Sequence, residues 1–333
     1  MTTSKASVLN RARQAKGALL LGCGGGGDCI QAIPVMNYLR ALGVERFLLA
    51  EYALKWWDKP GFVPFGCEIV SIDRLTHSQR VHPSVAMVSA DTTIDRGTSK
   101  VMPESARGIP LYEAIVAREL KVPVASISVE RGAQGVLEGL RFLMDDHRLD
   151  LFITVDVGAD AFYSGEETTV QSPLADAISV FCAAELDGYY GLTGYACDAE
   201  LPIDVLDRNV ARVMQAGGYL GAHGLTPDDV QDLSRVLKYF PNEAVEHWPR
   251  DAARGRLGTQ FCKGLWHIEV TPLAAVTMFF DPAKIMALNP LPAAIGPSKS
   301  ILEAEQIVLN NFNLTPETRL PLEVPIPTEP QVP

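Results

Sequence analysis

The chain has 333 residues, 47% of them hydrophobic, and a formal net charge of −11. This size suffices for one large α/β core, and no run reaches the roughly 18 uncharged apolar residues that a membrane-spanning helix needs. The negative charge argues against a nucleic-acid or anionic-membrane surface, because either requires a basic face.

The first two-thirds of the chain alternates strand-like and helix-like segments. Apolar runs predict strands at 17–21, 46–52, 67–72, 85–90, 122–129 and 149–155. Helical periodicity predicts helices at 29–42, 111–120 and 135–144. Strands that alternate with helices imply crossover connections, so we expect a doubly wound, mainly parallel, Rossmann-like α/β sheet.

Helical additions follow toward the C-terminus. Helices are expected at 174–186 and 205–216, a third begins at the N-cap Thr226 of the TPDD sequence, and strands are expected at 267–270 and 276–280. We therefore predict a polar N-terminal arm at 1–15 and a single α/β domain at 16–288. A proline-rich C-terminal tail is expected at 289–333. Its end, PLEVPIPTEPQVP at 321–333, is expected to be extended or disordered and away from the site.

A glycine-rich loop follows the first strand, in the sequence GALLLGCGGGGD at 17–28. Its GxGxxG pattern lies between a strand and a helix, where backbone N–H groups can bind an anion. The candidate ligand-binding residues are Gly22, Gly24, Gly25, Gly26, Gly27 and Asp28, with Glu51 as an acid for ribose hydroxyls at the end of the next strand.

Two residues complicate a dinucleotide site. Asp28 puts a negative charge where a pyrophosphate would lie, and Pro34 requires the following helix to kink or to begin near residue 33. The alternative is a tight turn in which Asp28 caps the helix. The number of glycines exceeds what a turn needs, which favours a ligand site.

An acidic segment follows the strand at 149–155, with the sequence DVGADAFYSGEETTVQSPLADA. The candidate catalytic residues are Asp156, Asp160, Glu166 and Asp176. Crowded carboxylates are stabilised by a metal, by a cationic substrate or by protonation. Asp156 and Asp160 are the candidate metal ligands, and oxygen ligands suit Mg²⁺ or Mn²⁺. The alternative is a solvated acidic loop.

A second glycine turn contains Arg131 and Gly132, and Arg131 either binds an anionic ligand or pairs with a neighbouring acid. The six cysteines form no CxxC pair and are expected to be buried free thiols in a cytoplasmic protein, with Cys23 and Cys29 notable because they flank the glycine loop.

Several segments together resemble the DUF1152 family. They are LLGCGGGGDCIQAIPVMNYLRALG, GIPLYEAIVAREL, VERGAQGVLEGL, VDVGADAFYSGEETTVQSPLADAISV and VTPLAAVTMFFDP, over roughly 15–285. The family's GGGGD, VDxGGD and SPLxD motifs match Gly24–Asp28, Asp156, Gly158, Asp160, Glu166, Pro173 and Asp176. Ala159 stands where the family usually has a second glycine. The resemblance implies a fold and a site position rather than a reaction.

The leading hypothesis is an enzyme acting on a small polar metabolite that is nucleotide-, phosphate- or amino-acid-like. The metabolite binds between 22–28 and 156–176, and the carboxylates act as acid and base or as metal ligands, in a hydrolase, transferase, lyase or cyclase. The alternatives are an enzyme dependent on NAD or S-adenosylmethionine, and a non-catalytic metabolite sensor. The expected partner is a small molecule, with neither nucleic acid nor membrane, and a homo-oligomer is compatible with the sequence.

Overall fold

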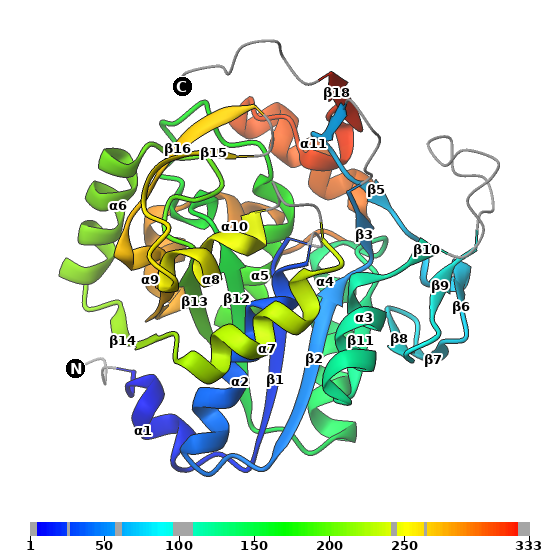
Figure 1. The fold of residues 1–333 in the computed structure, drawn as a ribbon. Helices are drawn as coiled ribbons and strands as arrows, with labels where there is room; N and C mark the ends of the chain where they lie inside the picture. Colours follow the sequence, from blue (N-terminus) through cyan, green and yellow to red (C-terminus); the bar gives the residue numbers. More distant parts are fainter. Residues whose placement is uncertain are drawn as a thin grey trace.

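The centre of the molecule is a mixed sheet of nine strands with helices on both faces (Figure 1). The computed structural model describes residues 5–24, 27–56, 62–95, 109–240, 245–262 and 265–325. In spatial order, the strands are β14 (Tyr219–Gly224), β17 (Val276–Phe280), β13 (Tyr189–Thr193), β12 (Leu151–Val157), β1 (Gly17–Gly22), β2 (Arg46–Tyr52), β11 (Val124–Ile127), β8 (Val85–Val88) and β7 (Gln79–His82).

The strands from β13 to β11 run parallel, and the outer strands on both sides pair antiparallel. In the central strand, Leu19 is paired with Leu48 of β2 and Phe152 of β12. Every residue of β1 is buried, as expected for a strand covered by helices on both faces. The predicted α/β fold with a mainly parallel core is confirmed.

Alternate residues of β1 contribute to two hydrophobic cores, because successive side chains of a strand point to opposite faces. Leu20 lies in the core covered by α1 (Val8–Ala12), α2 (Ala32–Ala41), α3 (Tyr112–Leu120) and α7 (Pro227–Leu237). Leu19 and Leu21 lie in the larger core, whose helices are α4 (Gly132–Asp146), α5 (Pro173–Glu185), α6 (Ile203–Gln215), α9 (Pro282–Leu288), α10 (Leu291–Ile295) and α11 (Ile301–Phe312).

The winding of the sheet reverses between β1 and β12. From β1 the chain continues outward to β2 and β11, and it then returns to the other side of β1 for β12 and β13. Loops that follow the two strands at such a reversal diverge, and ligands of open α/β sheets bind there, beyond the carboxyl ends. The glycine loop follows β1 and the acidic segment follows β12, so the fold brings both to this one point.

Two predicted helix starts show how local sequence sets the element boundaries. Pro34 lies in the first turn of α2, which begins at Ala32 after a short 3₁₀ turn, η1 (Asp28–Ile30). A helix does not need that N–H in its first turn, so the proline causes no break. Thr226 forms a capping box with Asp229 at the start of α7, as the TPDD sequence predicts.

Short sheets and one further helix surround the main sheet. They are β3 (Leu54–Lys55) with β5 (Glu68–Ile69), β4 (Phe62–Pro64) with β18 (Glu323–Pro325), β6 (Leu75–Thr76) with β9 (Thr93–Ile94) and β10 (Ile109–Pro110), β15 (Gly258–Cys262) with β16 (Trp266–Val270), and α8 (Trp248–Ala253). The strand predicted at 67–72 is wrong as a strand of the main sheet. Only Glu68–Ile69 is extended there, and it pairs with β3.

The proline-rich segment from residue 289 onward contains two helices that the sequence analysis did not predict. Helices α10 and α11 occupy much of it, and Ser300 caps α11 by accepting a hydrogen bond from the N–H of Glu303 on its side chain. Ile301 and Val308 of α11 are buried in the larger core. The prolines therefore separate helices rather than prevent them.

Within the described ranges no helix is both long and apolar enough to cross a membrane.

Candidate functional site

The glycine loop encloses a carboxylate of its own chain. Asp28 accepts hydrogen bonds from the Gly24 N–H at 2.7 Å and from the Val157 N–H at 3.3 Å. One carboxylate thus ties the loop after β1 to the end of β12, and Asp28 is only 6% exposed. Two N–H groups at the reversal point are used by the protein itself.

The described glycines of the loop are required by close packing. A Cβ on Gly22 would lie 2.3 Å from the backbone N of Cys29, and a Cβ on Gly24 would lie 2.3 Å from Asp28 Oδ2. Gly27 has φ +120°, and a Cβ there would lie 2.6 Å from the ring of Phe240. Gly25 and Gly26 lie outside the described residues.

Glu51, which the sequence analysis expected to bind ribose hydroxyls, instead contacts the backbone directly after the same loop. Its Oε2 accepts a hydrogen bond from the Cys29 N–H at 2.8 Å, and the residue is 1% exposed. Burial raises the pKa of Glu51 well above its usual range, and the negative charge of Asp28 and Glu113 raises it further. The Glu51 carboxyl group therefore supports the 3₁₀ turn η1 through the N–H of Cys29.

One basic and several aromatic side chains lie beside the loop. The Trp56 indole N–H donates to the Gly24 carbonyl at 3.3 Å. Lys55, buried at 5% exposure, has its Nζ 3.7 Å from the centroid of the Tyr112 ring, and that ring stacks on Phe240. The loop therefore has a cation in its neighbourhood that the loop sequence itself lacks.

Three acids of the predicted acidic segment converge. Asp156 lies near the end of β12, Asp160 begins the 3₁₀ turn η3 (Asp160–Phe162), and Asp176 lies in the first turn of α5. Carboxylate oxygens of the three lie within 4.8 Å of one another, and the residues are 4%, 4% and 3% exposed. We call these three residues the aspartate triad.

The triad has few hydrogen-bond donors. The Tyr190 hydroxyl donates to Asp156 Oδ2 at 2.5 Å. The Ser172 hydroxyl shares its one hydrogen between Glu200 Oε1 at 2.5 Å and, more weakly, Asp160 Oδ2 at 3.2 Å. Asp176 Oδ1 is buried and, among the described residues, has no hydrogen-bond partner. No lysine or arginine of the described residues forms an ion pair with any member of the triad.

Asp198 and Glu200 are two buried acids near the triad that the sequence analysis missed. Asp198 Oδ2 accepts from the Ala159 N–H at 3.0 Å. Glu200 accepts from the N–H groups of Gln171 and Ser172 at 2.6 and 2.9 Å, and from the Ser172 hydroxyl. They therefore hold both ends of the loop that carries Asp160. They follow β13, a strand that the sequence analysis also missed.

The turn at 158–159 fits this arrangement. A Cβ on Gly158 would lie 2.3 Å from Asp198 Oδ2, so only glycine leaves room for that carboxylate. Ala159 has φ −158°, which any residue adopts, so an alanine is accommodated at this position. Its N–H donates to Asp198 and holds the turn.

Burial and the neighbouring acids raise the pKa values of the three triad carboxyls. Burial raises the pKa of Asp156, Asp160 and Asp176 well above the usual range. The acids raise one another further: Asp28 acts most strongly on Asp156, Asp176 on Asp160, and Asp156 on Asp176. Without a cation, the triad therefore holds protons at a pH at which ordinary aspartates are ionised.

The C-terminal segment contributes another acid beside the triad. Glu317 is fully buried, and its two oxygens accept from the Leu174 and Ala175 N–H groups at 3.1 and 2.8 Å, at the start of α5. Burial raises the pKa of Glu317 to about 7, although the backbone hydrogen bonds act in the opposite direction. The proline-rich C-terminal tail therefore supports the helix that carries Asp176.

The thiols that flank the glycine loop are buried and protonated. Cys23 lies 2.9 Å from the Thr154 hydroxyl, measured from Sγ to Oγ1. Burial raises the pKa of Cys23 well above its usual range, and Asp176 and Asp156 raise it further. Burial likewise raises the pKa of Cys29, with Glu51 adding to the effect. Neither thiol has the lowered pKa of a reactive cysteine.

The remaining candidate residues lie apart from these contacts. Glu166 is exposed in the loop between η3 and α5. Arg131 forms a half-exposed ion pair with Glu138 at 3.0 Å and contacts the Ser84 hydroxyl. Gly132 has φ +63°, and a Cβ there would lie 2.8 Å from the Ser298 backbone, so this turn packs against the C-terminal segment.

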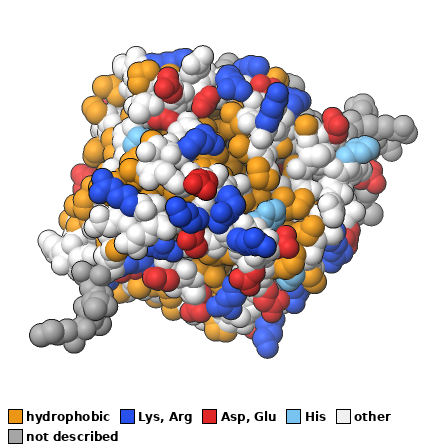
Figure 2. All heavy atoms as spheres, turned by 90° about the horizontal axis from the view of Figure 1, so that it is seen from below, with side chains coloured by type: hydrophobic (Ala, Val, Ile, Leu, Met, Phe, Trp, Pro, Cys, Tyr) orange, Lys and Arg blue, Asp and Glu red, His pale blue; other side chains and the backbone are white. Residues whose placement is uncertain are grey.

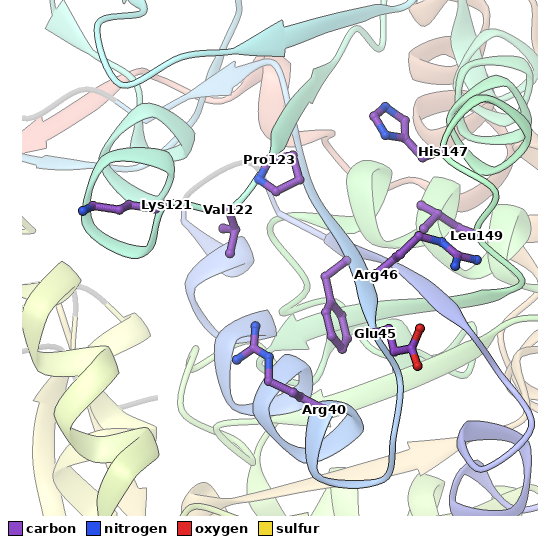
Figure 3. A pocket seen from close by; sticks show the side chains of 9 residues that line it. Arg40, Glu45, Arg46, Lys121, Val122, Pro123, His147 and Leu149 are labelled. Atoms are coloured by element: carbon purple, nitrogen blue, oxygen red, sulfur yellow. The ribbon is translucent and has the colours of Figure 1, made fainter.

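A different kind of hollow opens at the opposite, amino edge of the parallel strands. Its volume is about 370 Å³, and it is lined by Arg40, Glu45, Arg46, Phe47, Lys121, Val122, Pro123, His147 and Leu149. Figure 2 views this end of the molecule and shows Lys and Arg side chains scattered among acidic and apolar ones. In Figure 3 the side chains of Arg40, Arg46 and Lys121 point in different directions and do not converge.

The chain belongs to the DUF1152 family. The family model, described as protein of unknown function (DUF1152), matches residues 19–323. The match confirms the resemblance seen in the motifs and extends it beyond residue 285, through α10 and α11. Comparison with curated proteins and with solved structures gave no match. The function is therefore argued from the site.

Proposed function

We propose that the protein is an enzyme acting on a small polar metabolite, bound where the glycine loop after β1 meets the acidic segment after β12. In this proposal Asp156, Asp160 and Asp176 carry the chemistry, as acid and base or as ligands of a cation. Asp28, Asp198 and Glu200 position the loops through their backbone hydrogen bonds.

The observation that carries the proposal is the energetic cost of the aspartate triad. At an effective dielectric constant of about 20, two unit charges 4.8 Å apart repel by about 3.5 kcal/mol, and each pair of the triad is at least this close. When all three groups are ionised, three such pairs compare with a typical total stability of about 5–15 kcal/mol. Among the described residues no backbone N–H donates to the triad, so the ionised arrangement gives the fold no stability, which supports a functional role.

The chemistry that suits this arrangement is proton transfer or electrophilic assistance at a polar group. Carboxyls with raised pKa values act as general acid or base near neutral pH. The Tyr190 and Ser172 hydroxyls orient two of the three carboxylates. Hydrolysis, group transfer and elimination each use this combination, so the proposal covers the hydrolase, transferase and lyase classes.

Dependence on NAD or S-adenosylmethionine is the second candidate. The position of the glycine loop at the reversal of the sheet favours it. Two contacts weigh against it: the Gly24 N–H that would face a pyrophosphate donates to Asp28, and Glu51 is held beneath η1. We therefore favour a metabolite that binds without these cofactors.

Turnover in a mixture of metabolites tests the proposal against a sensor. Purified protein would be incubated with a protein-free cell extract, and compounds that disappear or form would be measured by mass spectrometry. We expect wild type to convert at least one compound, Asp160→Asn to lose that conversion, and Asp145→Asn to keep it. Asp145 is exposed at the end of α4. Ligand depletion in proportion to protein, with no product, would instead identify a sensor.

A further inference from the structure

We infer that Asp156, Asp160 and Asp176 together bind one hard divalent cation of the Mg²⁺, Mn²⁺ or Ca²⁺ class. The inference deepens the proposed function, since it names the occupant of that same site and makes the triad a metal centre. The triad's carboxylates come from three different elements, β12, η3 and α5, and meet at one point.

The spacing of the oxygens fits one metal ion. One oxygen from each residue of the triad lies within 4.8 Å of the other two. Three such oxygens share a point no more than about 2.8 Å from each, which is close to the Ca²⁺–oxygen distance of about 2.3–2.6 Å and longer than the Mg²⁺–oxygen distance of about 2.0–2.1 Å. Only a small inward movement is needed even for the smaller ion. Carboxylate oxygen ligands suit hard cations such as Mg²⁺, Ca²⁺ and Mn²⁺.

Asp176 supplies an observation independent of the clustering. The residue is 3% exposed, and its Oδ1 has no hydrogen-bond partner among the described residues. A buried carboxylate oxygen without a donor is more costly than a neutral unsatisfied group. Glu317 occupies the Leu174 and Ala175 N–H groups that open α5. Asp176, in the same turn, lies beside the other two carboxylates.

Charge favours a divalent cation over a substrate ammonium group. Three ionised carboxylates carry three negative charges, and Asp28 and Glu200 act on the same oxygens. A divalent ion leaves one net charge in the triad, whereas an ammonium group leaves two. The buried surroundings make each uncompensated charge expensive.

The neighbouring residues hold the ligands in place as supporting residues do around metal sites. Tyr190 fixes Asp156, and Ser172 links Asp160 to Glu200. Asp198 and Glu200 anchor the loop between β12 and α5 at both ends. Residues outside the coordination shell of a metal commonly hold its ligands in position in this way. Three protein oxygens leave further coordination positions for water and for a substrate oxygen.

Direct titration with Mn²⁺ tests the inference. Full-length protein would be treated with a chelator, exchanged into metal-free buffer near pH 7.5 and titrated with Mn²⁺. Free ion would be followed by its electron paramagnetic resonance signal. We expect one Mn²⁺ per chain, displaced by Mg²⁺ or Ca²⁺, and affinity at least tenfold weaker in Asp176→Asn and in Asp160→Asn. Asp145→Asn, the same substitution on an exposed residue, is expected to bind as wild type does.

Two results would overturn the metal site: no stoichiometric Mn²⁺ binding by wild type, or undiminished binding by folded Asp176→Asn and Asp160→Asn proteins, judged by circular dichroism. Stabilisation by amines but not by metals would assign the triad to an ammonium group instead. The result is separable from the proposed function. Metabolite conversion by a protein that binds no Mn²⁺ refutes the metal and keeps the enzyme, whereas metal binding without conversion keeps the metal and refutes the enzyme.

Discussion

The two edges of the parallel sheet handle charge in opposite ways. At the amino edge, Arg40, Arg46 and Lys121 line an open hollow, are exposed, and point in different directions (Figure 3). At the carboxyl edge, the three acidic side chains of the aspartate triad are buried and lie close to one another. Exposed charges interact weakly through water, whereas buried like charges repel strongly. The visible hollow is therefore the less informative of the two regions.

A second difference exists among the buried acids themselves. Asp28, Asp198, Glu200 and Glu317 accept hydrogen bonds from backbone N–H groups and join loops or helix starts. Within the described part of the chain, the aspartate triad accepts only from the hydroxyls of Tyr190 and Ser172. The first group has a structural explanation in these contacts. For the triad, the explanation we propose is a bound cation.

Replacing Glu200 is expected to give the largest change in stability. Glu200→Gln keeps one oxygen as an acceptor for the Gln171 and Ser172 N–H groups, but it replaces the carboxylate with a neutral amide and turns the NH₂ group toward the Ser172 hydroxyl. We expect the free energy of unfolding to fall by about 2–4 kcal/mol, since two backbone donors lose a charged partner. Urea denaturation would measure it. An unchanged midpoint would mean that Glu200 does not anchor the loop.

The pH dependence of stability is expected to be nearly as large. The pKa of Glu317 is raised to about 7 in the folded state from an ordinary value of 4.5, so the folded protein binds more protons between these values. Stability therefore falls as pH rises from about 4.5 to 7, by on the order of 3 kcal/mol for this group in metal-free protein.

Denaturation curves of chelator-treated protein across this range would show the effect of Glu317, and Glu317→Gln should flatten part of the slope. Added Mn²⁺ should oppose the fall, because metal ligands must be deprotonated and bind better as pH rises. A metal-free protein that becomes more stable from pH 5 to 7 would contradict the raised pKa of Glu317.

Asp176→Asn is expected to act in the direction opposite to Glu200→Gln. It removes a buried carboxylate that repels Asp156 and whose Oδ1 has no donor among the described residues. We expect metal-free protein to gain about 1–3 kcal/mol near pH 8, with a smaller gain at pH 5, because the raised pKa favours the uncharged form of the wild-type group as pH falls. Denaturation at both pH values measures it. A loss of stability at pH 8 would place Asp176 among the structural acids.

The smallest effects are expected at the amino edge. Arg40→Ala and Lys121→Ala alter exposed side chains, so the free energy of unfolding should change by no more than about 0.5 kcal/mol. Binding of Mn²⁺ and metabolite conversion should match wild type, as for Asp145→Asn. A large loss of conversion in either variant would transfer the functional assignment to this edge.

Much of the fold could be predicted because its signals are local. The apolar run at 46–52 coincides with β2, and the TPDD sequence gave the start of α7. β13 was missed because YYGLT is short, contains a glycine and shows no alternation, and it becomes a strand only between β12 and β17. α11 was missed because the dense prolines around it obscured a buried helical stripe.

Only part of the candidate site was predictable for the same reason. Asp156, Asp160 and Asp176 lie close together in sequence, after a recognisable strand. Asp198 and Glu200 follow β13, so recognising that strand would have placed them at the carboxyl edge as well. Glu317 comes from a distant segment and has no local signal. Asp28 was noted as unfavourable for a pyrophosphate, and the structure shows it bound by the loop itself.

A crystal structure of the protein soaked in Mn²⁺, with anomalous scattering data, would test the central claim most directly. We predict one strong anomalous peak about 2.0–2.6 Å from carboxylate oxygens of Asp156, Asp160 and Asp176. The same triad without a peak, its carboxyls hydrogen-bonded to one another as protonated acids, would contradict the account of the triad as a metal centre.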